Sequence, residues 1–357
     1  MSMLQIDTSK PALVTGATGY VAGWIVRRLL EEGVTVHAAV RDPGDKTKTW
    51  HLDEMAASLP GTLRYFKADL LENGSYDLAM DGCGIVFHTA SPFKLDVRDP
   101  QAELVDAALL GTRNVLDSVQ RSDSVTRVVL TSSCAAIYGD NADLALTARG
   151  VFTENDWNTS SSLHHMPYSY SKTVAEREAW SISRQATRWR LVVVNPSLVV
   201  GPGTHPRATS ESFNLVRQLG DGTMKAGAPA LPFGVVDVRD LAEAHLRAAY
   251  LPEAQGRYII SGQASSLLGL AAALAGRFGG YPLPRRALPK WLVWLAGPMT
   301  DRTVTRKLVA RNVGLPWKAD NGKSVAQLGM TYRPLDVSIQ DMFQQMIDSG
   351  QLPSLKP

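Results

Sequence analysis

The sequence has few cysteines and no long apolar run. Cys83 and Cys134 are the only two cysteines among 357 residues, which excludes a disulfide framework and favours a reducing compartment. The most apolar late segment, residues 288–299, is interrupted by Lys290 and Pro298 and is shorter than the ~20 residues that cross a bilayer. The polar N-terminus also lacks the apolar core of a signal peptide. These features predict a cytoplasmic protein.

An excess of charge of one sign is also absent. Lys and Arg number 37, Asp and Glu number 34, and the formal net charge is +3. The charges are interspersed and form no basic run, so neither nucleic acid nor a membrane is expected as a partner. Hydrophobic residues make up 45% of the chain, which is typical of a globular protein. At this length we expect one large domain with a smaller lobe, and no metal site is assigned.

The clearest motif is PALVTGATGYVAG, residues 11–23. A short apolar run at 12–14 is typical of a buried parallel strand. Gly16 and Gly19 follow, and residues 20–32 then have the apolar spacing of a helix. A glycine turn between a strand and a helix lets the backbone approach a pyrophosphate, whose charge the helix N-terminus favours. The pattern therefore favours nucleotide binding over an ordinary turn.

The second strand, expected at 34–40, ends in a basic segment. Arg41 comes directly after it, and Lys46 and Lys48 follow. In dinucleotide folds, residues at this position contact the adenosine ribose. An arginine there favours a 2′-phosphate, and a carboxylate repels it. A solvated basic loop would look the same, and Asp42 could turn inward. With the glycine turn in place, the segment favours NADP over NAD.

The rest of the first half alternates strands with helices. A long helix is expected at 100–119, and further strands at 63–67, 85–88, 125–130, 191–195 and 258–261. This alternation predicts an α/β fold, a doubly wound parallel (Rossmann) sheet, with a smaller and mostly helical C-terminal lobe. Residues 1–200 with about 236–262 would form the nucleotide-binding domain, and about 201–235 with 263–357 the substrate lobe.

Two segments outside this alternation carry expectations of their own. Residues 141–166 are polar and irregular and are interpreted as a surface loop. Trp291 and Trp294 are interpreted as core packing of the C-terminal lobe. His88, inside an apolar strand, is interpreted as a packed core histidine rather than a catalytic base.

A helix opening at Pro167 carries the chemically important pair. Tyr168 and Lys172 are four residues apart and share a face, whereas Tyr170 points to nearly the opposite side. A neighbouring ammonium favours the ionised phenol, so the tyrosine could exchange protons nearer neutral pH. A serine hydroxyl from Ser132 or Ser133 could hold a carbonyl oxygen beside it. The pair alone is also common by chance, as an exposed lysine packed on a tyrosine.

Seven motifs in order carry a family resemblance: T-G-A-T-G-Y-V-A, V-R-D-P, A-D-L, F-H-T-A-S-P, L-T-S-S, Y-x-x-x-K and N-P-S-L-V-V-G-P. Together they resemble the extended short-chain dehydrogenase/reductase superfamily. Within it, the chain is most similar to the dihydroflavonol reductase and cinnamoyl-CoA reductase group and its microbial carbonyl-reductase relatives. The resemblance covers about residues 11–260, with a looser similarity near the C-terminus.

The resemblance implies roles for individual residues. Tyr168 would protonate the nascent alkoxide, Lys172 would lower its pKa and bind the nicotinamide ribose, and Ser133 rather than Ser132 would be the catalytic serine. The residues implied to hold NADP(H) are Gly16, Thr18, Gly19, Tyr20 and Val21 at the pyrophosphate, Arg41 and Lys48 at the 2′-phosphate, Asp69 and Leu70 at the adenine, Thr89, Ala90 and Ser91 along the inner side, and Pro196, Ser197 and Leu198 at the nicotinamide.

The resemblance also implies an activity, the NADPH-dependent reduction of an aldehyde or ketone to an alcohol. Phe93, Tyr138 and Phe213 could supply a hydrophobic or aromatic substrate pocket. Tyr138 stands where plant dihydroflavonol reductases carry a flavonoid-binding asparagine, which argues against a flavonoid, and Asn114 is a candidate for the superfamily's helix asparagine. The expected partner is a small carbonyl or alcohol compound, and the protein is expected to be a monomer or homodimer.

Other activities on this fold remain open. A sugar-nucleotide dehydratase would carry an acidic pair just after the serine-bearing strand, where this chain has Cys134, Ala135 and Ala136. An epimerase would usually retain NAD, against which Arg41 argues. A 3β-hydroxysteroid-type dehydrogenase is a further alternative. A dinucleotide sensor without catalysis is disfavoured because the tyrosine–lysine pair is kept.

Overall fold

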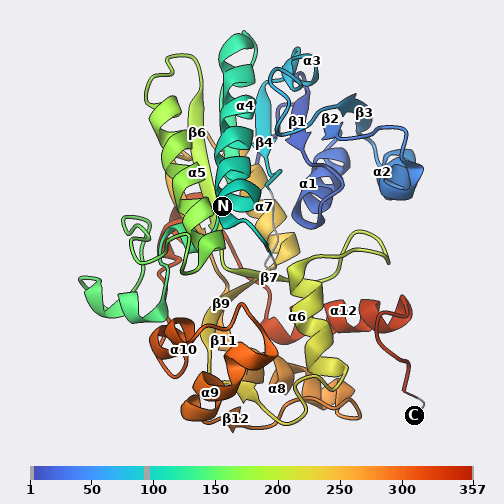
Figure 1. Ribbon diagram of the computed structural model, residues 1–357. Helices are drawn as coiled ribbons and strands as arrows, with labels where there is room; N and C mark the ends of the chain where they lie inside the picture. Colours follow the sequence, from blue (N-terminus) through green and yellow to red (C-terminus); the bar gives the residue numbers. More distant parts are fainter. Residues whose placement is uncertain (1–3, 92–96, 356–357) are drawn as a thin grey trace.

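A seven-stranded parallel sheet dominates the computed structural model, which describes residues 4–91 and 97–355 (Figure 1). The strand order is β10-β6-β5-β4-β1-β2-β3, and each neighbouring pair is parallel. The strands are β1 (Ala12–Thr15), β2 (Thr35–Val40), β3 (Thr62–Lys67), β4 (Ile85–His88), β5 (Arg127–Thr131), β6 (Arg190–Pro196) and β10 (Gly256–Ile260). The order confirms the predicted doubly wound fold, and it places a ligand crevice at the carboxyl ends of β1 and β4, where the winding reverses.

Helices cover both faces of this sheet. Apolar side chains of α1, α2 and α7 pack on one face, and those of α3, α4 and α5 on the other. The helices are α1 (Tyr20–Glu31), α2 (Lys46–Ser58), α3 (Asp77–Met80), α4 (Ala107–Arg121), α5 (Pro167–Ser183) and α7 (Val238–Tyr250). Six of the strands are almost wholly buried between the two layers, which explains why their sequences are nearly continuous apolar runs, whereas the edge strand β3 is partly exposed.

A smaller lobe lies at the carboxyl edge of the sheet, in the lower half of Figure 1. It contains a three-stranded sheet, β11-β9-β7, and a two-stranded sheet, β12-β8. The strands are β7 (Leu198–Val200), β8 (Ala228–Pro229), β9 (Pro232–Asp237), β11 (Gln263–Ser266) and β12 (Ala287–Leu288). The helices are α6 (Glu211–Gly220), α8 (Leu267–Phe278), α9 (Lys290–Thr300), α10 (Arg306–Asn312), α11 (Gly322–Leu328) and α12 (Leu335–Asp348). Most of the lobe is helical, as the sequence predicts.

Local structure departs from expectation in two helical segments. The helix expected at 100–119 begins as a π-helical turn, η1 (Gln101–Asp106), and continues as α4 to Arg121. The segment expected to be an irregular loop contains a 3₁₀ helix, η3 (Asn141–Leu146), and a shorter one, η2 (Cys134–Ala136), precedes it.

The expectation for Trp291 and Trp294 is wrong. They are 67% and 41% exposed, and Val293 is the residue of α9 that is buried, against Val309 of α10. The apolar spacing of α9 resembles that of a core helix, but the helix lies at the margin of a small lobe with too little protein around it to cover both rings. Among the described residues, no helix is long and apolar enough to cross a membrane.

Candidate active site

The glycine turn after β1 is shaped to admit an anion. Gly16 has φ of +63°, and a Cβ built on it would lie 3.0 Å from the Cβ of Ala90. The Gly16 amide donates to Ala39 O at 3.0 Å, and the Gly19 amide donates back to Gly16 O at 2.9 Å. Helix α1 begins after Gly19 with no side-chain cap and no acidic residue in its first turn. Its first amides are therefore available to a phosphate.

Thr15 ties the exits of β1 and β4 together. Its Oγ1 accepts the amides of Thr89 and Ala90 at 3.1 and 3.0 Å, and the Thr89 hydroxyl donates to Thr15 O. The Thr15 hydroxyl also lies 3.1 Å from His88 Nδ1. Burial lowers the pKa of His88 to about 3, and the charge of Lys172 adds to the effect. His88 is therefore a neutral, packed histidine, as the sequence analysis interprets it.

The end of β2 presents positive charge to solvent. Arg41 is exposed there. The carboxylate of Asp42 accepts the Gly44 amide at 2.8 Å and so closes its own turn rather than facing the crevice. Lys48 Nζ lies 3.3 Å from the carboxylate of Asp45, in an exposed pair that contributes little stability. This arrangement suits a 2′-phosphate better than a bare ribose.

The loop after β3 is fastened by Asn114 of α4. Its amide donates to the carbonyls of Leu70 and Glu72 at 3.1 and 2.6 Å and accepts the Gly74 amide at 3.0 Å. Leu70 packs closely on Gly111, where a Cβ would lie 3.1 Å from its side chain. The amide of Asn114 thus shapes the loop that holds Asp69 and Leu70, and it is not bonded to the tyrosine–lysine pair.

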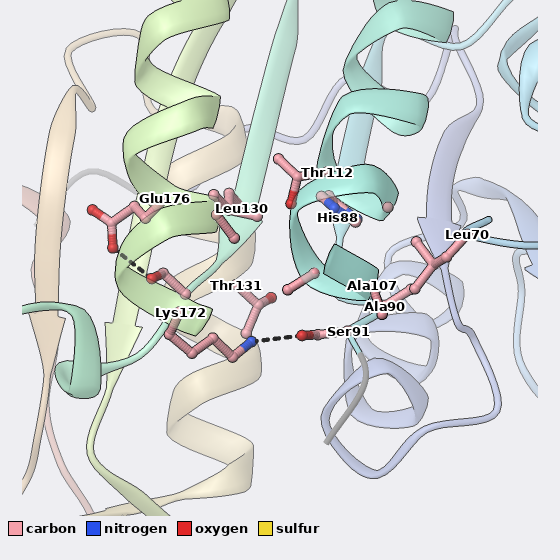
Figure 2. Close-up of a pocket in the computed structure, with 14 residues that line it drawn as sticks. Leu70, His88, Ala90, Ser91, Ala107, Thr112, Leu130, Thr131, Lys172 and Glu176 are labelled. Atoms are coloured by element: carbon pink, nitrogen blue, oxygen red, sulfur yellow. Dashed lines mark hydrogen bonds between the residues drawn. The ribbon is translucent and has the colours of Figure 1, made fainter. Parts of the chain in front are cut away.

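The predicted catalytic residues meet at the start of α5. Lys172 Nζ lies 5.9 Å from the ring centroid of Tyr168 and donates to Ser91 Oγ at 3.0 Å (Figure 2). The side chain of Tyr168 is also hydrogen-bonded with that of Ser133, beyond the end of β5. The exits of β4 and β5 and the start of α5 therefore bring a phenol, an ammonium and hydroxyls into one crevice.

Burial dominates the electrostatics of this group. It raises the pKa of Tyr168 to about 12, and the hydrogen bond with Ser133 opposes the rise. It lowers the pKa of Lys172 to about 8, and the carboxylate of Glu176 opposes that fall. In the structure the burial of the phenol sets the net direction of its pKa shift, and the expected effect of Lys172 on this phenol stays a prediction.

The structure separates the two serines of the T-S-S segment. The Ser132 hydroxyl donates to the buried carboxylate of Glu176 at 2.5 Å, whereas Ser133 faces Tyr168. Sequence reasoning missed Glu176 and its partner Arg257, whose Nε lies 2.6 Å from the carboxylate. Glu176 stands four residues after Lys172 on the same helix stripe, and that spacing was the signal available.

A polar atom without a partner marks the turn between β6 and β7. Pro196 ends β6, the Ser197 amide donates to Ile260 O at 3.1 Å, and Leu198 begins β7. The Ser197 hydroxyl is buried and has no hydrogen-bond partner within the described part of the chain. Such a group calls for a polar ligand. Together with the open α1 N-terminus and the basic end of β2, it makes the residues present fit a dinucleotide with a 2′-phosphate.

The structure describes two of the three predicted substrate-pocket residues. Phe213 is buried in the lobe core, with its ring centroid 5.3 Å from that of Tyr20. The Tyr20 hydroxyl donates to Gly201 O at 2.6 Å. The part of Tyr20 that remains for a nucleotide at the glycine turn is therefore its backbone amide. Tyr138 stacks on Phe152 at 4.6 Å, and Phe93 lies outside the described residues.

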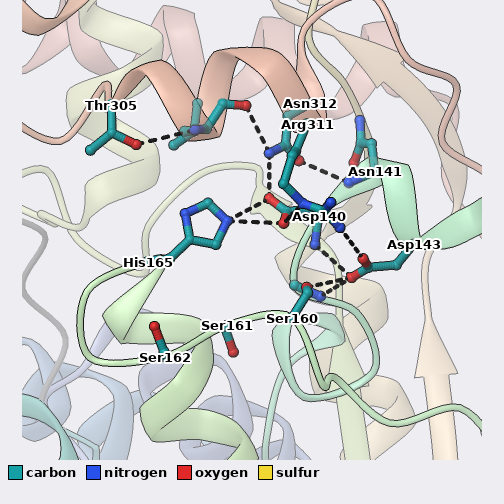
Figure 3. Close-up of polar contacts among 12 residues, drawn as sticks. Asp140, Asn141, Asp143, Ser160, Ser161, Ser162, His165, Thr305, Arg311 and Asn312 are labelled. Carbon is teal, nitrogen blue, oxygen red and sulfur yellow. Dashed lines mark hydrogen bonds and ion pairs between the residues drawn. The ribbon is translucent and has the colours of Figure 1, made fainter.

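A buried ionic cluster stands just before α5 (Figure 3). Asp140 is fully buried and accepts hydrogen bonds from His165 Nε2 at 2.9 Å, Arg311 Nε at 2.5 Å and Asn312 Nδ2 at 2.6 Å. The residue after His165, Met166, has φ of +54° and is the one non-glycine residue with positive φ in the described ranges. The cluster joins α10 of the lobe to the segment that leads into α5, and it supports this strained turn.

Comparisons with known proteins agree with this geometry. The model of the NAD dependent epimerase/dehydratase family matches residues 12–261. Cinnamoyl-CoA reductase CAD2 of Medicago truncatula is 35% identical over 339 residues, which cover 93% of this chain and 94% of that protein. Dihydroflavonol 4-reductase of Gerbera hybrida is 29% identical and covers 99% and 89%. The yeast methylglyoxal/isovaleraldehyde reductase Gre2, solved with NADPH, is 27% identical, has a TM-score of 0.77, and covers 96% and 99%.

Proposed function

The chain belongs to the NAD dependent epimerase/dehydratase family, the extended short-chain dehydrogenase/reductases, and on that premise we propose that it is an NADPH-dependent reductase of aldehydes or ketones. Its similarity to carbonyl-acting reductases, one of them solved with NADPH, supports the activity and the cofactor. The observation that carries the proposal is the meeting of Tyr168, Ser133 and Lys172 at the carboxyl ends of the strands.

The nucleotide would lie across the carboxyl edge of the large sheet. The amides of Gly16 to Val21 would hold the pyrophosphate, and Arg41 with Lys48 the 2′-phosphate. The loop of Asp69 and Leu70 would meet the adenine. The other residues proposed to contact it are Thr89, Ala90, Ser91, Pro196, Ser197 and Leu198. In this division of labour the first domain would bind the nucleotide, and the C-terminal lobe together with the segment around Tyr138 would supply the substrate pocket.

The chain's own residues would handle the proton. NADPH, when bound, supplies the hydride. Tyr168 donates its phenolic proton to the carbonyl oxygen as that oxygen gains charge, and the Ser133 hydroxyl donates a hydrogen bond to the same oxygen. The proton loss leaves a phenolate on Tyr168, which the ammonium of Lys172 stabilises. A phenol with a pKa of about 12 remains a protonated donor throughout the physiological range.

The substrate pocket is proposed to be apolar. The ring of Tyr138 stacks on that of Phe152, and its centroid lies 6.1 Å from that of Trp317. Tyr138 follows Ser133 by five residues, so this aromatic cluster is connected to the serine by a short segment. A dehydratase is disfavoured because the first acid after Ser133 is Asp140, and its carboxylate is buried and bonded to a histidine and an arginine. An elimination base would need a free carboxylate near the substrate.

The test is carbonyl-dependent oxidation of NADPH across a panel of aromatic and aliphatic aldehydes and ketones. Tyr168→Phe should lower kcat by at least ~10²-fold, because it removes the general acid. Tyr170→Phe is the matched control. It removes a tyrosine hydroxyl two residues further along the same helix, and this variant should retain activity. Turnover that survives Tyr168→Phe would contradict the proposal.

A further inference from the structure

Glu176 lies one helical turn beyond Lys172 on α5, with its side chain fully buried. Tyr168, Lys172 and Glu176 follow one another at four-residue spacing and share a face of the helix. Lys172 and Glu176 line the same cavity (Figure 2). The remaining ionisable group in that lining is His88 of β4, which is neutral. Glu176 is therefore the one carboxylate in this lining among the described residues, and its charge acts on Lys172 across the cavity rather than through a direct ion pair.

Three hydrogen-bond donors and one ion pair hold this carboxylate in place. The Ser132 hydroxyl donates at 2.5 Å, the Asn195 amide at 2.8 Å and the Trp180 indole at 3.3 Å. Arg257 of β10 pairs with it at 2.6 Å. These contacts come from four different segments of the chain and fix the position of the carboxylate.

The same network reaches the turn that carries Ser133. Asn195 Nδ2 donates both to Glu176 Oε2 at 2.8 Å and to the carbonyl of Ser133 at 3.0 Å. Ser132, bonded to the carboxylate, is the preceding residue. Loss of the carboxylate would therefore loosen the backbone on both sides of the Ser133 hydroxyl.

We infer that Glu176 is a positioning residue of this reductase, whose carboxylate holds Lys172 in its charged form and fixes the turn that carries Ser133. The inference rests on the proposed function, and it adds a residue that touches neither substrate nor nucleotide. Lys172 must carry its charge to stabilise the phenolate left on Tyr168. A buried ammonium without a carboxylate nearby would lose its proton more readily.

The electrostatic consequence can be measured directly. Burial lowers the pKa of Lys172 to about 8 and Glu176 opposes this fall, so Glu176→Gln should lower that pKa further, by about one pH unit. The alkaline limb of the pH profile of kcat/KM for NADPH should shift to lower pH by the same amount. Above pH 9 the variant should then be about tenfold less active than the wild type.

Glu178→Gln is the matched control. Glu178 stands on the same helix and pairs with Arg113 at 2.6 Å, outside the cavity lining. It should leave the alkaline limb unchanged. Glu176→Asp keeps the charge and should restore the limb toward its wild-type position. A readout without turnover is NMR titration of 13Cε-labelled lysines in the nucleotide-free protein, with the Lys172 signal assigned from Lys172→Arg.

Glu176→Gln alone leaves Arg257 buried without its anion, so this variant could unfold. The double variant Glu176→Gln, Arg257→Met removes the orphaned cation and still takes the carboxylate from Lys172. A downward shift of the Lys172 titration in either folded variant supports the inference. An unchanged Lys172 titration, or a limb that moves equally in Glu178→Gln, overturns it. Absence of carbonyl-dependent NADPH oxidation in the wild type would instead overturn the proposed function and leave the NMR result to be judged by itself.

Discussion

Arg41 provides a quantitative prediction about the cofactor. It is exposed at the end of β2, while Asp42 is turned toward the Gly44 amide and Lys48 is paired with Asp45. Of the three basic residues that follow β2, Arg41 is thus the one without an ion pair to the described residues, since Lys46 is paired with Asp53. A charge-assisted hydrogen bond contributes about 1.5–3 kcal/mol, which corresponds to roughly 10- to 150-fold in an equilibrium constant. Arg41→Ser should therefore raise the KM for NADPH by about that factor.

NADH lacks the phosphate, so its KM should change less than about twofold in the same variant. The control is Arg64→Ser. Arg64 is exposed on β3 and pairs in register with His37, four residues before Arg41, which places it about 13 Å away along the strands. Steady-state kinetics with both nucleotides at two ionic strengths would test the argument, because a phosphate contact weakens with salt. Equal losses for NADPH and NADH, or a similar loss in Arg64→Ser, would refute the reasoning.

Three further predictions follow from the site. Gly16→Ala should cost about 1–2 kcal/mol of stability through its positive φ and should also weaken NADPH binding because its Cβ meets Ala90. Gly33→Ala is the control: Gly33 also has a positive φ but has open space around it, so this variant should lose stability without weaker NADPH binding. Burial raises the pKa of the Asp140 carboxyl, but hydrogen bonds from Arg311, His165 and Asn312 more than offset that rise, so the net pKa lies below its usual value. The stability that Asp140 contributes is therefore present above the unfolded pKa of about 3.9 and is lost as pH falls through the lower folded value. Asp140→Asn should lower the free energy of unfolding, measured with urea near neutral pH, by about 3 kcal/mol, and an unchanged urea midpoint would contradict this. kcat/KM for NADPH should fall as pH rises through about 8, where Lys172 loses its proton, and a flat profile to pH 10 would count against a role for its charge.

Sequence reasoning was strongest where the signal was local. The strand, glycine turn and helix around Gly16 and the four-residue spacing of Tyr168 and Lys172 are read from adjacent residues, and the fold they predict is confirmed. The pairing of Glu176 with Arg257, 81 positions later, has no local signature.

Burial is the other quantity that the sequence conceals. Burial raises the pKa of Tyr168, and the spacing of Tyr168 and Lys172 in the sequence does not reveal that burial. Trp291 was expected in a core because its helix is apolar, yet the lobe around it is too small to cover the ring. In both cases the outcome depends on how much protein surrounds the side chain.

The account's central claim is that this chain transfers hydride from NADPH to a carbonyl carbon while Tyr168 supplies the proton. The most direct measurement is mass spectrometry of the product formed from NADPH deuterated at C4 in the transferable position. We predict one deuterium at the carbinol carbon for each NADPH consumed, and almost no product with Tyr168→Phe. A product without deuterium, or a substrate converted with no net NADPH consumption, would contradict the account and indicate an internal redox cycle of the epimerase type.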